Sequence, residues 1–277
     1  VEGAKIGSIE LTFIPSDPEI PEFKEINIGT AGSISLLLQC ILPALLFAKQ
    51  TKLRIIGGTS GLHAPTIEYF ELVKTWYLKK IGINLEIEVE KQGFYPRGNG
   101  IVNVKIFPVK SLSGLELIEQ GKLEKIIGKS IVGSLPIDIA KRQARAAKNY
   151  LEKFNVEINI EEKEYKTLSP GTSITLAAIF ENCVLGSDAL GEKGKPAEKV
   201  GLEAAIELEK SINSKACFDK YMSDQILIYL ALAKHFFNQK SKIKVEELTN
   251  HAKTNIYTIE KFLGKIFEIE GNIIKVQ

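Results

Sequence analysis

The sequence predicts an α/β fold in which repeated units enclose a smaller inserted α/β domain. Between about residues 23 and 109, strand-like and helix-like patterns follow the order strand, helix, strand, helix, strand, strand. From about residue 219 a similar order returns, whereas the segment between has a different texture. Such a return suggests an insertion into a repeated architecture. We therefore predict a large domain from residues 1–115 and 214–277, and an inserted domain from 116–213.

The elements of the first unit follow from alternation, helical spacing and turn residues. Residues 9 to 14 alternate as a strand, and the loop PSDPEIPE comes next. A short strand leads into the turn GTAGS, whose last residue, Ser33, can cap the following helix. The strand KLRIIGG precedes a helix that Pro65 opens. Two more strands, NLEIEVE and IVNVKIFPV, flank the segment GFYPRGNG.

The inserted domain and the last unit are predicted in the same way. The inserted domain is expected to contain a strand at KSIVGS, a helix at 137–154, strands at 156–164 and 173–187, and a helix at 196–211. From Asp219 we expect a long helix, a strand, a short helix, the segment NHAKTN, a further helix and the hairpin KIFEIEGNIIKV.

Composition excludes several classes of protein. The net charge is only +2, so a polyanion would have to bind a local patch and not the whole surface. The most apolar run, roughly 34–48, is too short and too interrupted for a membrane span, so no membrane partner is expected. The cysteines (Cys40, Cys183 and Cys217) have no metal or disulfide spacing, which favours reduced thiols and a cytoplasmic setting.

The histidines differ in what surrounds them. His235 lies on an apolar, lysine-flanked helix, which favours a structural role, and His63 could be structural or functional. His251 comes just before Thr254 and Asn255, both good N-cap residues. It is therefore predicted to lie immediately upstream of a helix N-terminus, where backbone N–H groups can receive a phosphate. A purely structural role for His251 stays open on spacing alone.

Other polar residues permit two interpretations each. GTAGS is either a tight strand-to-helix turn or a phosphate cradle, since it matches neither a P-loop nor a dinucleotide fingerprint. Gln39, on an apolar helix, needs a core carbonyl or a ligand as its partner if it is buried. Tyr221 shares a helix face with Asp224 or Gln225, although an exposed helix start explains this equally well.

GFYPRGNG contains more than a turn requires. Asn99-Gly100 alone would close a two-residue hairpin, yet the segment adds two aromatic residues, a proline, two further glycines and Arg97. The surplus suggests that its backbone or side chains contact something else.

Six motifs in order resemble the RNA 3′-terminal phosphate cyclase family. They are IGTAGS…LLLQ…LP, GGT…AP, GFYPRGNG, GEKGKPAEKVG, YMSDQ and HAKTN…EKFL, and they extend over essentially the whole chain. The resemblance implies repeated βαβαββ units, like the C-terminal domain of translation initiation factor 3, with a smaller α/β domain inserted into the last unit. GFYPRGNG resembles the family's glycine-rich hairpin, which usually has glycine where Asn99 stands.

The resemblance also implies an activity. Family members use ATP to convert an RNA 3′-terminal phosphate to a 2′,3′-cyclic phosphate, through a covalent histidyl-AMP and an adenylylated RNA end. His251 matches the nucleophile of the family motif H-x-x-T-N, and a divalent cation (Mg²⁺ or Mn²⁺) is expected with the ATP. No metal-binding residue is assigned in this sequence.

The resemblance assigns roles to further residues. Tyr221 and Pro65 resemble the pair that sandwiches adenine, and Tyr69 falls where the family often has another aromatic near the base. Polar contacts of the nucleotide site are matched by Gln39, Asp224 and Gln225. Arg97 is a candidate contact for the RNA phosphate.

The N-terminal region departs from the family pattern. Family members begin with a further stretch that has an acidic residue and several arginines, and nothing here matches it, so the printed chain is expected to be incomplete. The main alternative is a catalytically silent relative that binds RNA in ribosome assembly, and a nucleotide-binding regulator is a third. The presence of His251, Tyr221, Asp224 and Gln225 argues against the silent relative.

Overall fold

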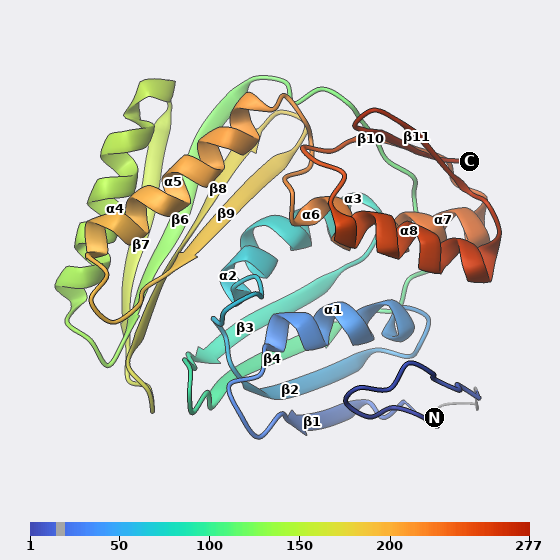
Figure 1. Ribbon diagram of the computed structural model, residues 1–277, viewed down its shortest axis with the longest axis horizontal. Helices are drawn as coiled ribbons and strands as arrows, with labels where there is room; N and C mark the ends of the chain where they lie inside the picture. The colour runs from blue at the N-terminus through green and yellow to red at the C-terminus, as the bar shows by residue number, and fades with distance from the viewer. Residues whose placement is uncertain (15–19) are drawn as a thin grey trace.

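The computed structural model describes residues 1–14 and 20–277. The predicted loop PSDPEIPE falls largely on residues 15–19, which lie outside the described residues. Within the described part, three four-stranded sheets are covered by helices (Figure 1). The strands are β1 (Phe23–Asn27), β2 (Thr51–Gly57), β3 (Leu85–Lys91), β4 (Gly100–Ile106), β5 (Glu116–Leu117), β6 (Leu123–Gly133), β7 (Glu157–Tyr165), β8 (Gly171–Phe180), β9 (Val184–Leu190), β10 (Ser241–Lys244), β11 (Phe267–Glu270) and β12 (Ile273–Val276).

The helices connect these strands, and most lie near the predicted places, although Thr66 caps α2 and Pro65 precedes that helix without opening it. They are α1 (Ile34–Leu45), α2 (Ile67–Tyr69), the π-helical turn η1 (Phe70–Lys74), α3 (Thr75–Lys80), α4 (Ile137–Leu151), the 3₁₀ turn η2 (Glu152–Phe154), α5 (Ala197–Asn213), α6 (Met222–Gln225), α7 (Leu227–Phe237) and α8 (Asn250–Leu263). Ser33 caps α1 as predicted, because its hydroxyl accepts a 3.2 Å hydrogen bond from the Leu36 N–H. None of the helices in the described segments has the length and hydropathy needed to cross a membrane.

Two of the sheets have the same topology. In the first, the strand order is β1-β2-β4-β3, with β1 and β2 parallel and the other two pairs antiparallel. In the C-terminal sheet the order is β5-β10-β12-β11, again with the first pair parallel and the others antiparallel. Each sheet therefore corresponds to one βαβαββ unit, and the predicted fold class is confirmed.

The third sheet belongs to the insertion. Its order is β7-β6-β8-β9, and α4 and α5 pack beside each other against it (Figure 1). The chain enters this unit after β5 and returns to the C-terminal sheet through α6 and α7. Residues 116–117 were predicted to open the inserted domain, yet they pair with β10 of the C-terminal sheet. The domain limits themselves stay a prediction.

Glycines permit close packing on both sides of the GFYPRGNG hairpin. A Cβ atom at Gly171 or Gly133 of the inserted sheet would lie only 2.3 or 2.6 Å from the Phe94 ring. A Cβ at Gly98, where φ is +61°, would lie 2.6 Å from the Thr30 carbonyl oxygen. The hairpin thus contacts the GTAGS turn on one side and the inserted domain on the other, which accounts for residues that a plain turn would not need.

Several sequence-based expectations are wrong in detail. The stretch 173–187, expected as strand, is divided between β8 and β9, and residues 245–249 form no separate short helix before NHAKTN. Residues 9 to 14 form no strand; the described N-terminal residues have only an isolated bridge between Glu2 and Thr12. Alternation alone does not make a strand, because a strand also needs a partner. The single helix expected from Asp219 is divided into α6 and α7 at Ile226. The last difference concerns the start of α8, which determines where His251 lies.

Candidate active site

His251 lies in the first turn of α8, and the expectation of a loop position is wrong. Thr249 is the N-cap, because its hydroxyl accepts a 3.0 Å hydrogen bond from the Ala252 N–H. Thr254 was expected to cap the helix, but its hydroxyl donates to the Asn250 carbonyl one turn back, at 2.8 Å. His251 is exposed at the helix end whose free N–H groups and dipole favour negative charge. A phosphate can therefore approach the imidazole at this end of α8.

Helix α6 carries a carboxylate toward this histidine. The Asn255 side-chain amide donates to the Asp224 backbone carbonyl at 3.2 Å, which joins α8 to α6. Burial raises the pKa of the Asp224 carboxyl, while the positive charges that His251 and Lys74 can carry lower it. The segment YMSDQ ends at Gln225 and HAKTN begins at His251, 26 positions later, yet the two meet in one site.

Tyr221 presents an aromatic surface beside this pair. It precedes α6 as the N-cap residue, and 37% of the residue is exposed. Its ring meets the Tyr69 ring edge to face, with centroids 6.1 Å apart, and the Lys220 ammonium lies 4.9 Å from its centre. Exposed and supported from behind, the ring is available for stacking.

Asp219 connects Tyr69 and Tyr221, and this role was not predicted from the sequence. Its Oδ1 accepts hydrogen bonds from the Tyr69 hydroxyl (2.6 Å) and from the N–H groups of Tyr221 (3.0 Å) and Met222 (2.9 Å). Its Oδ2 accepts from the Gly186 N–H in the inserted sheet, at 2.9 Å. Burial raises the pKa of Asp219 to about 6 despite these donors. An aspartate at a predicted helix start was a signal for a cap, but nothing local indicated Tyr69 or Gly186.

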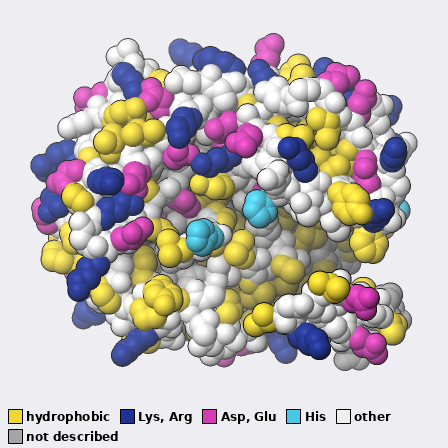
Figure 2. Space-filling view, in the orientation of Figure 1, with side chains coloured by type: hydrophobic (Ala, Val, Ile, Leu, Met, Phe, Trp, Pro, Cys, Tyr) yellow, Lys and Arg dark blue, Asp and Glu magenta, His cyan; other side chains and the backbone are white. Residues whose placement is uncertain are grey.

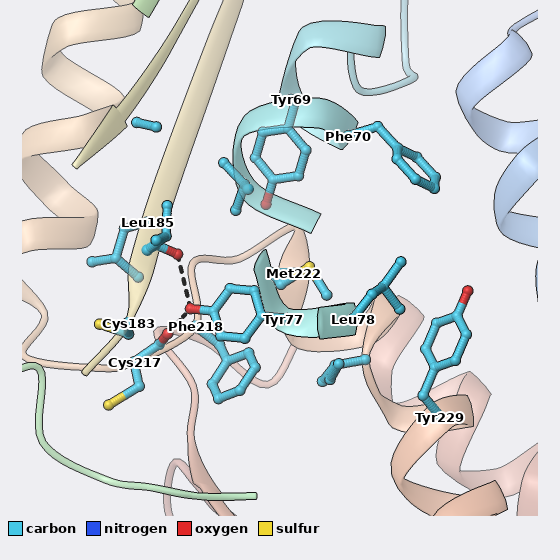
Figure 3. Close-up of a cluster of buried hydrophobic side chains, with 14 of the residues drawn as sticks. Tyr69, Phe70, Tyr77, Leu78, Cys183, Leu185, Cys217, Phe218, Met222 and Tyr229 are labelled. Atoms are coloured by element: carbon cyan, nitrogen blue, oxygen red, sulfur yellow. Dashed lines mark hydrogen bonds between the residues drawn. The ribbon is translucent and has the colours of Figure 1, made fainter. Parts of the chain in front are cut away.

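The segment before α6 is also fixed to the inserted sheet (Figure 3). The Tyr77 hydroxyl lies between the carbonyls of Val184 and Cys217 and contacts both oxygens. The Tyr77 ring stacks on Phe218, with centroids 4.5 Å apart. Because these residues are buried, the start of α6 has little freedom to shift.

Pro65 is held from two directions. Its carbonyl accepts a 2.5 Å hydrogen bond from the Ser35 hydroxyl of α1, and the next residue, Thr66, donates its N–H to Asp188 at 2.9 Å. The charge of Asp188 also helps to raise the pKa of Tyr221, so the carboxylate is near both predicted walls of the adenine site. Asp188, Glu203 and Glu207 line a cavity of about 330 Å³.

The remaining predicted residues lie at different depths. Gln225 is buried, and its side-chain oxygen accepts a 3.2 Å hydrogen bond from the Lys74 ammonium. Gln39 is half-buried on α1, and Arg97 is exposed on the hairpin, where its N–H donates to Ser169 at 3.1 Å. Among the residues described, no hydrogen bond or ion pair joins the side chains of Gln39 or Arg97 to His251. Their roles stay predictions.

Figure 2 shows histidine side chains near a hollow that has hydrophobic side chains along its floor. Within residues 1–14 and 20–277, no group of three His, Cys, Asp or Glu side chains is placed to hold a metal ion. We therefore assign no protein ligand to the expected divalent cation.

The fold and the site together define a class of enzyme, and the comparison with known proteins agrees with it. Two βαβαββ units, an inserted α/β domain and a histidine at a helix N-terminus fit an enzyme that acts on phosphate groups. A family model described as RNA 3′-terminal phosphate cyclase matches residues 1–269, and the chain belongs to that enzyme family.

Archaeal relatives are similar over almost the whole chain. The RNA 3′-terminal phosphate cyclase of Pyrococcus furiosus is 43% identical over 274 residues, which are 99% of this chain and 78% of the relative. The proteins of the same name from Saccharolobus solfataricus and Pyrobaculum neutrophilum are 43% and 42% identical, over 98% of this chain and 78% and 77% of theirs.

Proposed function

We propose that this protein uses ATP to convert an RNA 3′-terminal phosphate to a 2′,3′-cyclic phosphate, with His251 as the nucleophile. The observation that carries the proposal is the exposed His251 in the first turn of α8, beside Asp224 of α6. At this position the imidazole can attack a phosphorus atom while the helix N-terminus stabilises the phosphate oxygens. Only a neutral imidazole has the free lone pair that the attack requires.

Each step of the reaction balances. The His251 nitrogen forms a bond to the α-phosphorus of ATP, the bond to the bridging oxygen breaks, and pyrophosphate leaves. An oxygen of the RNA 3′-phosphate then attacks the same phosphorus, which releases the histidine and leaves AMP on the RNA end. Finally the 2′-hydroxyl gives its proton to water, and its oxygen attacks the 3′-phosphorus and expels AMP. The order is reasonable because a phosphate monoester is a poor electrophile, and the vicinal hydroxyl is already in position.

The surrounding residues receive binding roles. Tyr221 and Pro65 stack on the two faces of adenine, and the buried Tyr69 supports the Tyr221 ring from its edge. Gln39, Asp224 and Gln225 make polar contacts with the nucleotide. These three residues need not touch each other, because ATP is long enough to reach several elements.

The proposal also includes a contact for the RNA and a role for the divalent cation. Arg97, exposed on the hairpin, contacts the RNA phosphate. Mg²⁺ or Mn²⁺ bound to the triphosphate would neutralise its charge during the first step. The scattered cysteines, all of them free thiols, are consistent with a cytoplasmic location.

Covalent labelling tests the nucleophile directly. The 277-residue chain is incubated with α-labelled ATP and Mg²⁺ or Mn²⁺, and acid-labile label on the protein is measured. We expect label on the wild type, none on His251→Ala, and nearly normal label on His235→Ala. His235 is the matched control because it too is an exposed helical histidine. Label that survives in His251→Ala, or a wild type that binds ATP without label, would contradict the proposal and favour a silent nucleotide-binding relative.

A further inference from the structure

Lys74 is a charged side chain buried where the proposed site meets the core. It ends the π-helical turn η1, and its side chain is fully buried. The ammonium lies 4.9 Å from the centre of the Phe70 ring and 5.8 Å from that of Tyr229. Burying a lysine is costly, and burial lowers the pKa of Lys74 to about 7. Such a residue calls for a functional reason, and π-helical turns are frequent at functional sites.

The polar contacts of Lys74 all point to α6. In the described residues its one hydrogen bond goes to the Gln225 side-chain oxygen, at 3.2 Å. Asp224, which precedes Gln225, supplies the negative charge that favours the ammonium form of Lys74. The nearby Tyr229 hydroxyl is buried, and no partner for it is found among the described residues, so it does not compete for the lysine.

This contact determines which end of the Gln225 amide faces outward. A lysine ammonium has three donors and no acceptor, so only the amide oxygen can face it. The amide nitrogen, with two N–H donors, must then point away from Lys74. Within the part of the chain that the structure describes, no protein group accepts a hydrogen bond from that nitrogen.

We infer that Lys74 is a positioning residue for nucleotide binding: it orients Gln225 so that the amide N–H groups face the ligand and select a hydrogen-bond acceptor on ATP. The inference rests on the proposed function, in which Gln225 contacts the nucleotide. Lys74 itself touches no ligand. Without Lys74 the amide can rotate and present its oxygen, which an acceptor on the ligand would repel.

Equilibrium binding tests this without requiring catalysis. The probe is the ATP analogue with a methylene group between the α- and β-phosphorus atoms, titrated at pH 6, where Lys74 is protonated. Lys74→Met keeps the length of the side chain but removes the donors, and it should raise the Kd about tenfold, the equivalent of one hydrogen bond. Its Tm should be unchanged or higher, because a buried charge has been removed. Lys79→Met, the same change at an exposed position of α3, should leave the Kd unchanged.

A double-mutant cycle tests whether Lys74 acts through Gln225. In a Gln225→Ala background, Lys74→Met should change the Kd by less than about twofold. Three outcomes would each overturn the inference. The Kd of Lys74→Met could be unchanged, or the effects in the cycle could be fully additive. The third is a loss of affinity that a fall in Tm explains. If Lys74→Met does not fold, Lys74→Gln replaces it. Glutamine can donate as well as accept, so its Kd should rise about threefold, and no rise would overturn the inference.

The two proposals fail in different ways. A wild type that binds the analogue but takes no label from ATP contradicts adenylylation, while the comparison of Kd values still tests Lys74. A wild type that is labelled normally, together with a Lys74→Met that binds as tightly, contradicts only the role of Lys74. A wild type that does not bind the analogue overturns both.

Discussion

The Tyr69 hydroxyl donates a 2.6 Å hydrogen bond to the buried carboxylate of Asp219, 150 positions later in the chain. Through this contact the helix that follows Pro65 is fixed to the start of α6, where the Tyr221 N–H also donates to Asp219 and the Tyr221 ring meets the Tyr69 ring edge to face. The same carboxylate reaches the inserted sheet through the Gly186 N–H. One aspartate thus connects both repeated units and the insertion at the proposed adenine site.

Removing the Tyr69 hydroxyl should destabilise the protein less than changing the Asp219 carboxylate. Tyr69→Phe loses one hydrogen bond to a charged group, so the free energy of unfolding should fall by about 2 kcal/mol. Asp219→Asn should lower the free energy of unfolding by about 3 kcal/mol or more. Each carboxylate oxygen now accepts from N–H groups, and in the variant the amide NH2 would face such donors in place of one oxygen. Urea denaturation measures both. A larger loss for Tyr69→Phe than for Asp219→Asn would contradict the central place given to Asp219.

The contact between the hairpin and the insertion predicts a non-additive pair. Gly171→Ala would place a methyl group within 2.3 Å of the Phe94 ring, and overpacking of this kind costs about 1–3 kcal/mol. In a Phe94→Ala background the added methyl group has space, so Gly171→Ala should cost much less there. Thermal unfolding of the four proteins measures the coupling. Equal costs in the two backgrounds would show that the close approach does not matter energetically.

Glu68 makes stability depend on pH. Its carboxylate is buried, Gln92 donates 2.6 Å to one oxygen, and the other oxygen is without a partner in the described residues. Burial raises the pKa of Glu68 to about 7, from 4.5, although the Gln92 hydrogen bond lowers it. The folded state therefore binds more protons between pH 4.5 and 7. The contribution of Glu68 to stability is fully present below that range and is lost as the pH rises through 7.

Glu68→Gln should remove this dependence. Above pH 7 the variant should be more stable than the wild type by roughly 3 kcal/mol, the shift multiplied by 1.36 kcal/mol per pH unit, and near pH 4 the difference should vanish. Denaturation across this range measures it, with the exposed Glu124→Gln as control. A constant difference at every pH would mean that Glu68 does not titrate as described.

Most of the order of elements could be predicted from the sequence, because it follows from local patterns. Alternation, helical spacing and the Ser33 cap are all visible within about ten residues of one another. The start of α8 was misplaced because Thr249 and Thr254 are both acceptable caps, and only the folded contacts decide between them. The resemblance to the family supplied the residues of the site, and their roles as ligand contacts remain predictions.

The supports of the site could not be predicted, because they depend on long-range packing. Asp219 is an ordinary helix-start residue until Tyr69 and Gly186 meet it. Lys74 reads as a surface lysine, although it lies four residues after Phe70 and three before Tyr77 on the buried face. It is buried because α6 and α7 cover that face, which no local pattern indicates.

The last prediction asks whether the Tyr221 ring stacks on adenine or only packs against α6. Base–aromatic stacking is worth about 1–3 kcal/mol, so Tyr221→Ala should weaken the ATP dependence of His251 labelling by roughly one to two powers of ten. Tyr221→Phe should cost little, because the ring is kept and only the hydroxyl is lost. If Tyr221 only packs α6, Tyr221→Ala would instead lower the Tm and leave the ATP dependence unchanged. Measuring both quantities on each variant decides, and an unchanged ATP dependence in a folded Tyr221→Ala protein would rule out the clamp.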